Sequence, residues 1–305
     1  MRIGTSLAES ANPQVLAELR DDLAKAVDEG FSSAWMANIF GLDALTALAV
    51  AGRGVGDIEI GTAVVPTYPR HPAVLAQQAL TTALALDARF ALGIGLSHKI
   101  VIQDMYGYSF DAPAAHMSEY LSILLPLLNG EAASFHGKTL HAGIGLSAPR
   151  AGEVPVLLAA LGPQMLRLAG QRTAGTILWM TGPATVRDYI VPTISAAAQQ
   201  AGRPAPRVVC ILPVCVTDDP DAARVRAAKV FEIYGHLPSY RAMLDREGAA
   251  GPGDVAIVGD EDSVAAQITA LAGYGVTDFV AGEYAKDDQE RRRTRTVLKT
   301  LIASS

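Results

Sequence analysis

The sequence is poor in cysteine, in aromatic residues and in charge. Its 305 residues include two cysteines, while aromatic residues make up 6% of the chain and charged residues 18%. Cys210 and Cys215 stand in one apolar run, without the spacing of zinc ligands and too few to build a disulfide framework. We therefore expect both thiols in the core, and protein classes that depend on disulfides are excluded.

Positive charge and long apolar runs are also scarce. Lys and Arg total 25 against 31 Asp and Glu, which gives a net charge of −6. This balance leaves no basic stripe for nucleic acid or for an anionic membrane surface. No window keeps the ~18 apolar residues of a membrane-spanning helix, and the amino terminus lacks the apolar region of a signal peptide. We expect a cytoplasmic protein whose partner is a small molecule.

Several catalytic signatures are missing as well. The six histidines show no ligand pair such as HxxxH, so we expect no metal site. Paired carboxylates at strand ends and the G-x-S-x-G turn are absent, which argues against a glycosidase and a serine hydrolase. The run from Gly93 to Gly95 lacks the third glycine of a dinucleotide-binding fingerprint, and no P-loop occurs.

Apolar residues are abundant in the chain, and they recur at regular spacings. Hydrophobic residues make up 50% of the sequence, and the mean hydropathy is +0.24. This is enough to bury a core that offsets the entropy of ordering the chain. Short apolar runs alternate with helical patterns of spacing three and four. The expected strands lie at 2–7, 31–36, 58–65, 89–94, 156–160, 176–180, 207–216 and 276–281.

This alternation favours a closed parallel barrel over an open sheet. The connections are short and right-handed throughout, and no Pro/Ser linker divides the chain. We therefore expect the α/β class, a (β/α)8 TIM barrel formed by one domain over residues 1–305. Irregular composition predicts insertions at about 97–115, 133–150 and 236–258.

Reacting groups in such a barrel gather at the carboxyl ends of the strands. Gly95 ends the fourth expected strand, where a missing side chain lets the backbone approach a ligand ring. The turn at 160–163 leads into a helix whose free N–H groups could hold a phosphate. On spacing alone, the same turn is more typical of an ordinary loop with Pro163 at the first helical position.

Four runs of this sequence together resemble a known family. They read GTAVVPTYPRHPAVLAQQA at 61–79, RFALGIGLSH at 89–98, VLLAALGPQMLRLAG at 156–170 and LPSYRAMLDREG at 237–248. They are similar to the luciferase-like flavin and deazaflavin oxidoreductases, especially the branch that uses coenzyme F420. The resemblance implies an α/β barrel with insertions, a homodimer and a small organic substrate.

The resemblance also implies which residues hold the cofactor. In that family a non-proline cis peptide supports the back of the deazaflavin ring, and the matching bond here joins Thr62 and Ala63. Asn38 stands where sugar-phosphate dehydrogenases of the F420 branch have a cofactor-contacting aspartate. The full implied cofactor set is Asn38, Thr62, Ala63, Val65, Gly95, Leu96, Ser97, His98, Ala160, Leu161, Gly162, Gln164 and Met165.

His98 matches the position of an acidic catalytic residue in those dehydrogenases. A histidine there could give a proton to the substrate as hydride arrives. The alternative is that His98 only hydrogen-bonds the cofactor or caps its loop. Two departures, Ile39 in place of a catalytic histidine and Gly182 in place of a phosphate-binding lysine, make glucose 6-phosphate a poor substrate.

An apolar pocket for an enone, an imine or another unsaturated acceptor is expected instead. Its candidate residues are Trp35, Phe40, Tyr106, Tyr108, Trp179, Met180 and Tyr284. The leading hypothesis is an F420-dependent oxidoreductase that moves a hydride between the deazaflavin and a mainly apolar substrate. Two alternatives stay open: an FMN-dependent monooxygenase of the same fold, and a cofactor-binding barrel without catalysis.

Overall fold

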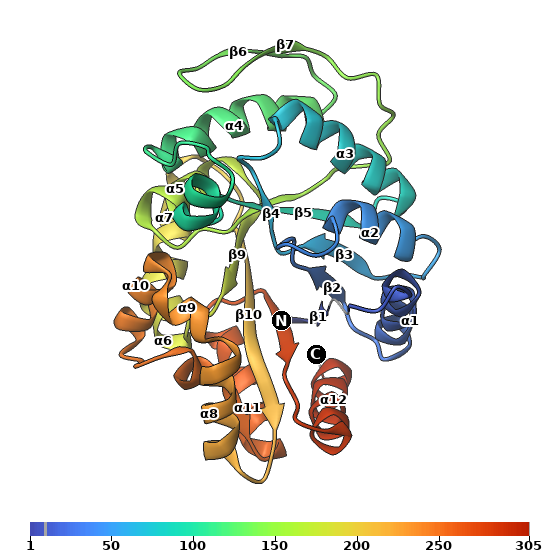
Figure 1. The fold of residues 1–305 in the computed structure, drawn as a ribbon, viewed down its shortest axis with the longest axis vertical. Coiled ribbons are helices and arrows are strands. Elements are labelled where there is room, and N and C mark those ends of the chain that lie inside the picture. The colour runs from blue at the N-terminus through green and yellow to red at the C-terminus, as the bar shows by residue number, and fades with distance from the viewer. Residues whose placement is uncertain (9–10, 305) are drawn as a thin grey trace.

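Parallel strands form a closed ring at the centre of the protein. The computed structural model describes residues 1–8 and 11–304. Within these ranges eight strands run round the ring, and β12 pairs with β1 to close it (Figure 1). In ring order they are β1 (Arg2–Leu7), β2 (Ser33–Met36), β3 (Glu59–Thr62), β5 (Phe90–Gly95), β8 (Val156–Leu158), β9 (Gly175–Trp179), β10 (Arg207–Val216) and β12 (Asp278–Glu283). The expected (β/α)8 barrel is confirmed.

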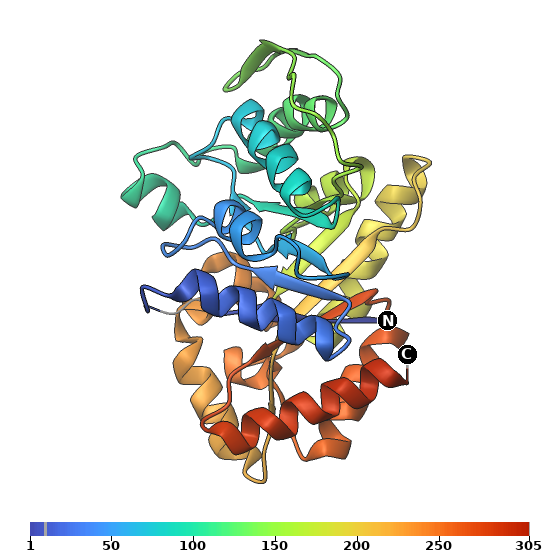
Figure 2. The ribbon, with the colours of Figure 1, turned by 90° about the vertical axis from the view of Figure 1, so that its right-hand side faces the viewer.

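Helices cover the outside of this ring. Several begin with proline in the first turn, where its missing N–H costs nothing, and others begin after an aspartate whose side chain caps the first turn. The helices are α1 (Val15–Asp28), α2 (Ala44–Ala51), α3 (Pro72–Ala85), α4 (Pro113–Leu128), α5 (Pro163–Arg172), α6 (Pro183–Thr185), α7 (Val191–Gln200), α8 (Pro220–Val230), α9 (Glu232–His236), α10 (Pro238–Glu247), α11 (Glu261–Gly273) and α12 (Asp288–Ala303). The last of them, α12, packs beside β1 (Figures 1 and 2).

Trp35 fills the inside of the barrel. Its side chain is fully buried among small and branched residues of the other strands, among them Ala91, Leu157 and Val280. The indole fits because Gly61 on the neighbouring strand has no side chain; a Cβ there would lie 2.3 Å from the ring. The barrel is therefore a packed core, and a ligand has room only beyond its rim.

Two of the three irregular segments contain structure that the sequence pattern did not predict. Residues 97–115 hold a π-helix, η1 (Ile100–Met105), and the start of α4; η1 projects from the barrel in Figure 2. The hairpin of β6 (Ala133–His136) and β7 (His141–Ile144) forms where a hairpin was expected. Residues 236–258 contain α10, a 3₁₀ turn η3 (Pro252–Val255) and the short strand β11 (Ile257–Gly259), which pairs with the outer half of β10.

Ion pairs tie the amino ends of the strands together. Arg207, the first residue of β10, reaches Glu59 of β3 at 2.8 Å and Asp278 of β12 at 2.7 Å. Arg2 adds to the same group, beside a shallow hollow at this end of the barrel. Groups at this face of a barrel typically serve stability, so we assign this cluster to the fold.

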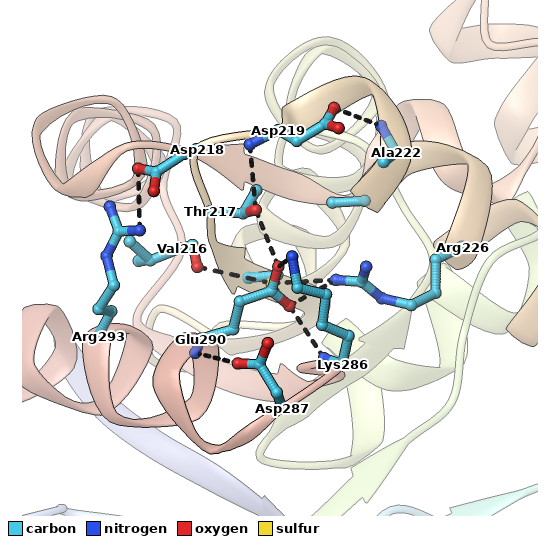
Figure 3. A network of polar contacts seen from close by, with 12 residues as sticks. Val216, Thr217, Asp218, Asp219, Ala222, Arg226, Lys286, Asp287, Glu290 and Arg293 are labelled. Carbon is cyan, nitrogen blue, oxygen red and sulfur yellow. Dashed lines mark hydrogen bonds and ion pairs between the residues drawn. The ribbon is translucent and has the colours of Figure 1, made fainter.

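A second buried network holds α12 against β10 and α8. Glu290, which is 3% exposed, accepts hydrogen bonds from Thr217 Oγ1 at 2.9 Å, from Arg226 Nη2 at 2.8 Å and from the Lys286 N–H at 2.9 Å (Figure 3). Although burial opposes ionisation, these donors hold the pKa of Glu290 at about 2. The carboxylate stays charged because each neighbour donates to it.

Candidate active site

A cavity of about 370 Å³ opens at the carboxyl ends of the strands on one side of the ring. Its walls come from the ends of β3, β5, β8, β9 and β10, from the segment before α4, and from the first turns of α5 and α10. The lining residues are Ala63, Val64, Gly95, Leu96, Ser97, His98, Lys99, Phe110, Pro113, Ala159, Leu161, Gly162, Met165, Ile177, Leu178, Trp179, Ile211, Pro238, Ser239 and Tyr240.

The irregular end of β3 makes one wall of this cavity. The expected cis peptide between Thr62 and Ala63 is wrong by one residue, because the cis bond joins Ala63 and Val64. Thr62 is held in the strand: its hydroxyl donates to the Gly93 carbonyl at 2.8 Å and accepts from the Gly93 N–H at 2.9 Å. The chain therefore leaves its regular course after Thr62, before the two-residue strand β4 (Val65–Pro66).

Small residues keep this wall flat. A Cβ on Gly93 would lie 2.0 Å from the Thr62 carbonyl oxygen, and one on Gly95 would lie 2.7 Å from Val64 Cγ2. Larger residues at these positions would push apart the ends of β3 and β5. Together with Ala63, Val64 and Ala159, the glycines leave an apolar surface against which a planar ring can lie.

The first turn of α5 supplies free backbone donors at the cavity. Gly162 precedes the helix, no side chain caps this end, and the first turn holds no acidic residue. The first amides of a helix have no partner within it, so those of Gln164 and Met165 are available to an anion. A Cβ on Gly162 would meet nothing within 4 Å, which leaves open space over the turn.

His98 stands on the loop that follows β5. Its carbonyl accepts from the Ile102 N–H at 2.9 Å, and this bond begins η1. The preceding residue, Ser97, has φ of 59°, a left-handed conformation that turns the chain at this point. The imidazole is half-buried at the cavity, and burial lowers its pKa below the usual value.

An aromatic group stands opposite His98. Tyr240 of α10 lines the cavity, with its ring centroid 5.5 Å from that of His98. Tyr234 meets Tyr240 edge-on at 5.1 Å and Trp179 at 5.7 Å, so the rings brace one another. The sequence patterns did not single out Tyr240, although it lies in the run at 237–248 that carries part of the family resemblance.

The structure gathers many of the implied cofactor residues at this cavity. Those that line it are Ala63, Gly95, Leu96, Ser97, His98, Leu161, Gly162 and Met165. Thr62 and Val65 are buried behind the wall, and Ala160 is buried after β8. Gln164 is exposed and reaches the site only through its backbone in the first turn of α5.

Asn38 lies outside the lining of this cavity, so its implied contact with the cofactor stays a prediction. Its Oδ1 accepts from the Ala44 N–H at 3.0 Å, at the amino end of α2. Most of the candidate aromatic pocket also lies elsewhere: Trp35 is in the barrel core, Met180 is buried, and Phe40, Tyr106 and Tyr108 are exposed. The Tyr284 hydroxyl donates to the Ala223 carbonyl. Of the residues proposed for the aromatic pocket, Trp179 alone lines the cavity.

Residues 1–8 and 11–304 contain neither a metal-binding cluster nor a membrane-spanning helix. In these ranges no group of three or more His, Cys, Asp or Glu side chains could hold a metal ion. Over the same ranges, every helix is too short or too polar to cross a bilayer.

Comparison with known proteins identifies the family. The luciferase-like monooxygenase family matches residues 1–278. The chain belongs to the luciferase-like monooxygenase family. Its sequence resemblance to luciferase-like proteins is thereby confirmed.

Proteins similar to this chain include F420-dependent and FMN-bound examples. The 5,10-methylenetetrahydromethanopterin reductase of Methanolobus tindarius is 27% identical over 297 aligned residues, which cover 87% of this chain and 90% of the relative. The structure of coenzyme F420 dependent tetrahydromethanopterin reductase from Methanopyrus kandleri matches with a TM-score of 0.80 at 22% identity, over 99% of this chain and 97% of that one. The oxygenating constituent of 3,6-diketocamphane monooxygenase from Pseudomonas putida, in complex with FMN, matches with a TM-score of 0.79 at 18% identity, over 100% of this chain and 98% of that one. These structural likenesses show a shared fold.

Proposed function

We propose that this protein is a coenzyme F420-dependent oxidoreductase. In this proposal the cavity at the carboxyl rim holds the deazaflavin, and a hydride passes between it and a mainly apolar, unsaturated organic substrate. The observation that carries the proposal is the pairing of a flat apolar wall at Ala63, Val64 and Gly95 with the uncapped first turn of α5. Such a site suits a planar ring that bears an anionic tail.

The residues of the cavity meet the needs of this cofactor. The wall of small residues would lie along the ring, and the amides of Gln164 and Met165 would hold the phosphate. Reduced F420 supplies a hydride, and no protein group near the wall has to take part in that redox step. The chain supplies position, exclusion of water and proton exchange.

His98 is the proposed proton-exchanging residue. It lines the same cavity and keeps one titratable group beside the apolar wall. Because its pKa is lowered, the neutral imidazole prevails at neutral pH and accepts a proton when a substrate is oxidised. The imidazolium, which donates the proton in the reverse direction, gains population in acid.

An FMN-dependent monooxygenase is the second candidate, because the FMN-bound relative has the same fold over the whole chain. Spectral titration of the purified protein with F420 and with FMN separates the two. Tight binding of F420 with negligible binding of FMN supports the proposal, and the reverse result supports the monooxygenase. Binding of F420 without turnover of any unsaturated acceptor would leave a binding barrel without catalysis.

The proposal also covers the oligomeric state of the protein and its location in the cell. We expect a homodimer, as the family resemblance implies, and Val50 on α2 and Val74 on α3 are exposed apolar residues on the outside of the barrel. Light scattering of the purified protein measures this directly. Cys210 and Cys215 are free thiols, which suits a reducing cytoplasm.

A further inference from the structure

The cavity is polar on one side only. Ser97, His98 and Lys99 follow β5, and Ser239 and Tyr240 face them from the first turn of α10. The rest of the lining is almost wholly apolar. A ligand in this cavity therefore meets hydrogen-bonding side chains at a single corner.

Two donors at this corner have no protein partner. Within the described part of the chain, neither the ring nitrogens of His98 nor the hydroxyl of Tyr240 hydrogen-bonds to another residue. Polar groups held beside an apolar surface are costly unless a partner reaches them. Their ring centroids lie 5.5 Å apart, a distance at which the two rings touch, so both polar groups belong to one corner of the cavity.

The charges at this corner favour an acceptor that is negative. Lys99 brings a positive charge to this corner. None of the described lining residues is an aspartate or a glutamate. The positive end of the α10 dipole lies at the same place, because Pro238, Ser239 and Tyr240 all line the cavity. A cationic iminium substrate would find no counter-ion here.

We infer that His98 and Tyr240 together bind the carbonyl oxygen of the substrate, which is a conjugated carbonyl compound. This inference rests on the proposed function. Addition of a hydride to the β-carbon forms a C–H bond, breaks the C=C bond and moves its electron pair to the oxygen, giving an enolate. Tyr240 stabilises that oxygen by donating a hydrogen bond and keeps its own proton. A proton from His98 or from water then reaches the α-carbon.

Burial is consistent with this role for Tyr240. It raises the pKa of the hydroxyl, which therefore remains a protonated donor at neutral pH. The edge-on contact with Tyr234 at 5.1 Å fixes the ring, so the donor is in place before the substrate binds. Tyr240 is thus a substrate-binding residue contributed by the insertion at 236–258.

The test uses 4-nitrophenolate, whose anionic oxygen on a flat ring resembles an enolate. Wild type and Tyr240→Phe are loaded with F420, loading is measured first, and the nitrophenolate dissociation constant is then measured by calorimetry. We expect wild type to bind and Tyr240→Phe to bind about tenfold more weakly, the effect of losing one hydrogen bond to a charged oxygen. Protein without cofactor is titrated in parallel.

Matched controls separate the hydrogen bond from packing. Tyr234→Phe removes a hydroxyl from the neighbouring ring and should bind nitrophenolate like wild type. The neutral ligand 4-nitroanisole should bind equally to all three proteins. Absent binding in wild type, equal binding in Tyr240→Phe, or equal losses in both variants overturns the inference. Failure of F420 loading counts against the proposed function instead, and the protein without cofactor still tests the donor pair.

Discussion

His98 lies where a small change in pKa selects the direction of proton exchange. Its imidazole has no protein hydrogen bond in the described residues, so burial alone sets the lowered pKa. The nearby titratable groups at the cavity are Lys99 and Tyr240, and the raised pKa of Tyr240 keeps its hydroxyl neutral. The protonation state of His98 therefore follows pH on the acid side of the usual histidine range.

A pH profile of turnover tests this role. In substrate reduction the imidazolium is the donor, so kcat/KM should rise as pH falls towards the lowered pKa. In substrate oxidation the neutral ring is the acceptor, so the rate should be lost in acid. His98→Ala should lower kcat about 100-fold and flatten both profiles, as for loss of a general acid or base.

The control for this measurement is His136→Ala in the exposed hairpin, which should behave like wild type. The substrate is any acceptor that the wild type turns over. A His98→Ala enzyme with the parent rate and an unchanged profile would show that His98 only contacts the cofactor or shapes its loop.

At the scale of elements, α12 depends on one buried carboxylate. Glu290 joins α12 to Thr217 after β10 and to Arg226 of α8 (Figure 3). Glu290→Gln removes the negative charge that neutralises the Arg226 guanidinium in a mostly buried position. We expect the free energy of unfolding to fall by about 3 kcal/mol, measured by urea denaturation.

The same helix offers a matched control. Asp288 pairs with Arg291 at 2.7 Å on the surface, where both side chains are more than half exposed. Asp288→Asn should cost less than about 1 kcal/mol, as exposed ion pairs do. Equal losses of unfolding free energy in the two variants would show that the buried Glu290 network stabilises the protein no more than an exposed ion pair does. The Glu290 contribution should also fade in acid, as pH falls below the usual glutamate value towards the pKa of about 2.

The local sequence predicts some helices and strands more clearly than others. The strand expected at 2–7 forms as β1, and the periodic apolar residues of 15–28 form α1. By contrast, α10 has the sequence PSYRAMLDRE, in which polar residues break the apolar period, and β11 is only three residues long. Both are stabilised by neighbours distant in sequence, which a local pattern does not register.

At the scale of the whole molecule, the alternation of strands and helices was enough to predict the barrel. The rule that ligands bind at the carboxyl ends of strands then placed Gly95, His98 and Gly162 at one cavity. The approach of Tyr240 to His98 joins segments far apart in the chain and depends on how α10 packs on the rim. The cis peptide lies between Ala63 and Val64, one bond beyond the position that the resemblance implied.

The central claim is that this cavity, with the first turn of α5, binds F420. The most direct test is the F420 dissociation constant of wild type, Gly162→Glu and Gly143→Glu. Both glycines are exposed with free space around them, but Gly162 begins α5 and Gly143 lies in the hairpin. We predict that a carboxylate at Gly162 weakens F420 binding about 100-fold or more by repelling the phosphate, while Gly143→Glu binds like wild type. Equal F420 affinity in all three proteins would contradict the account.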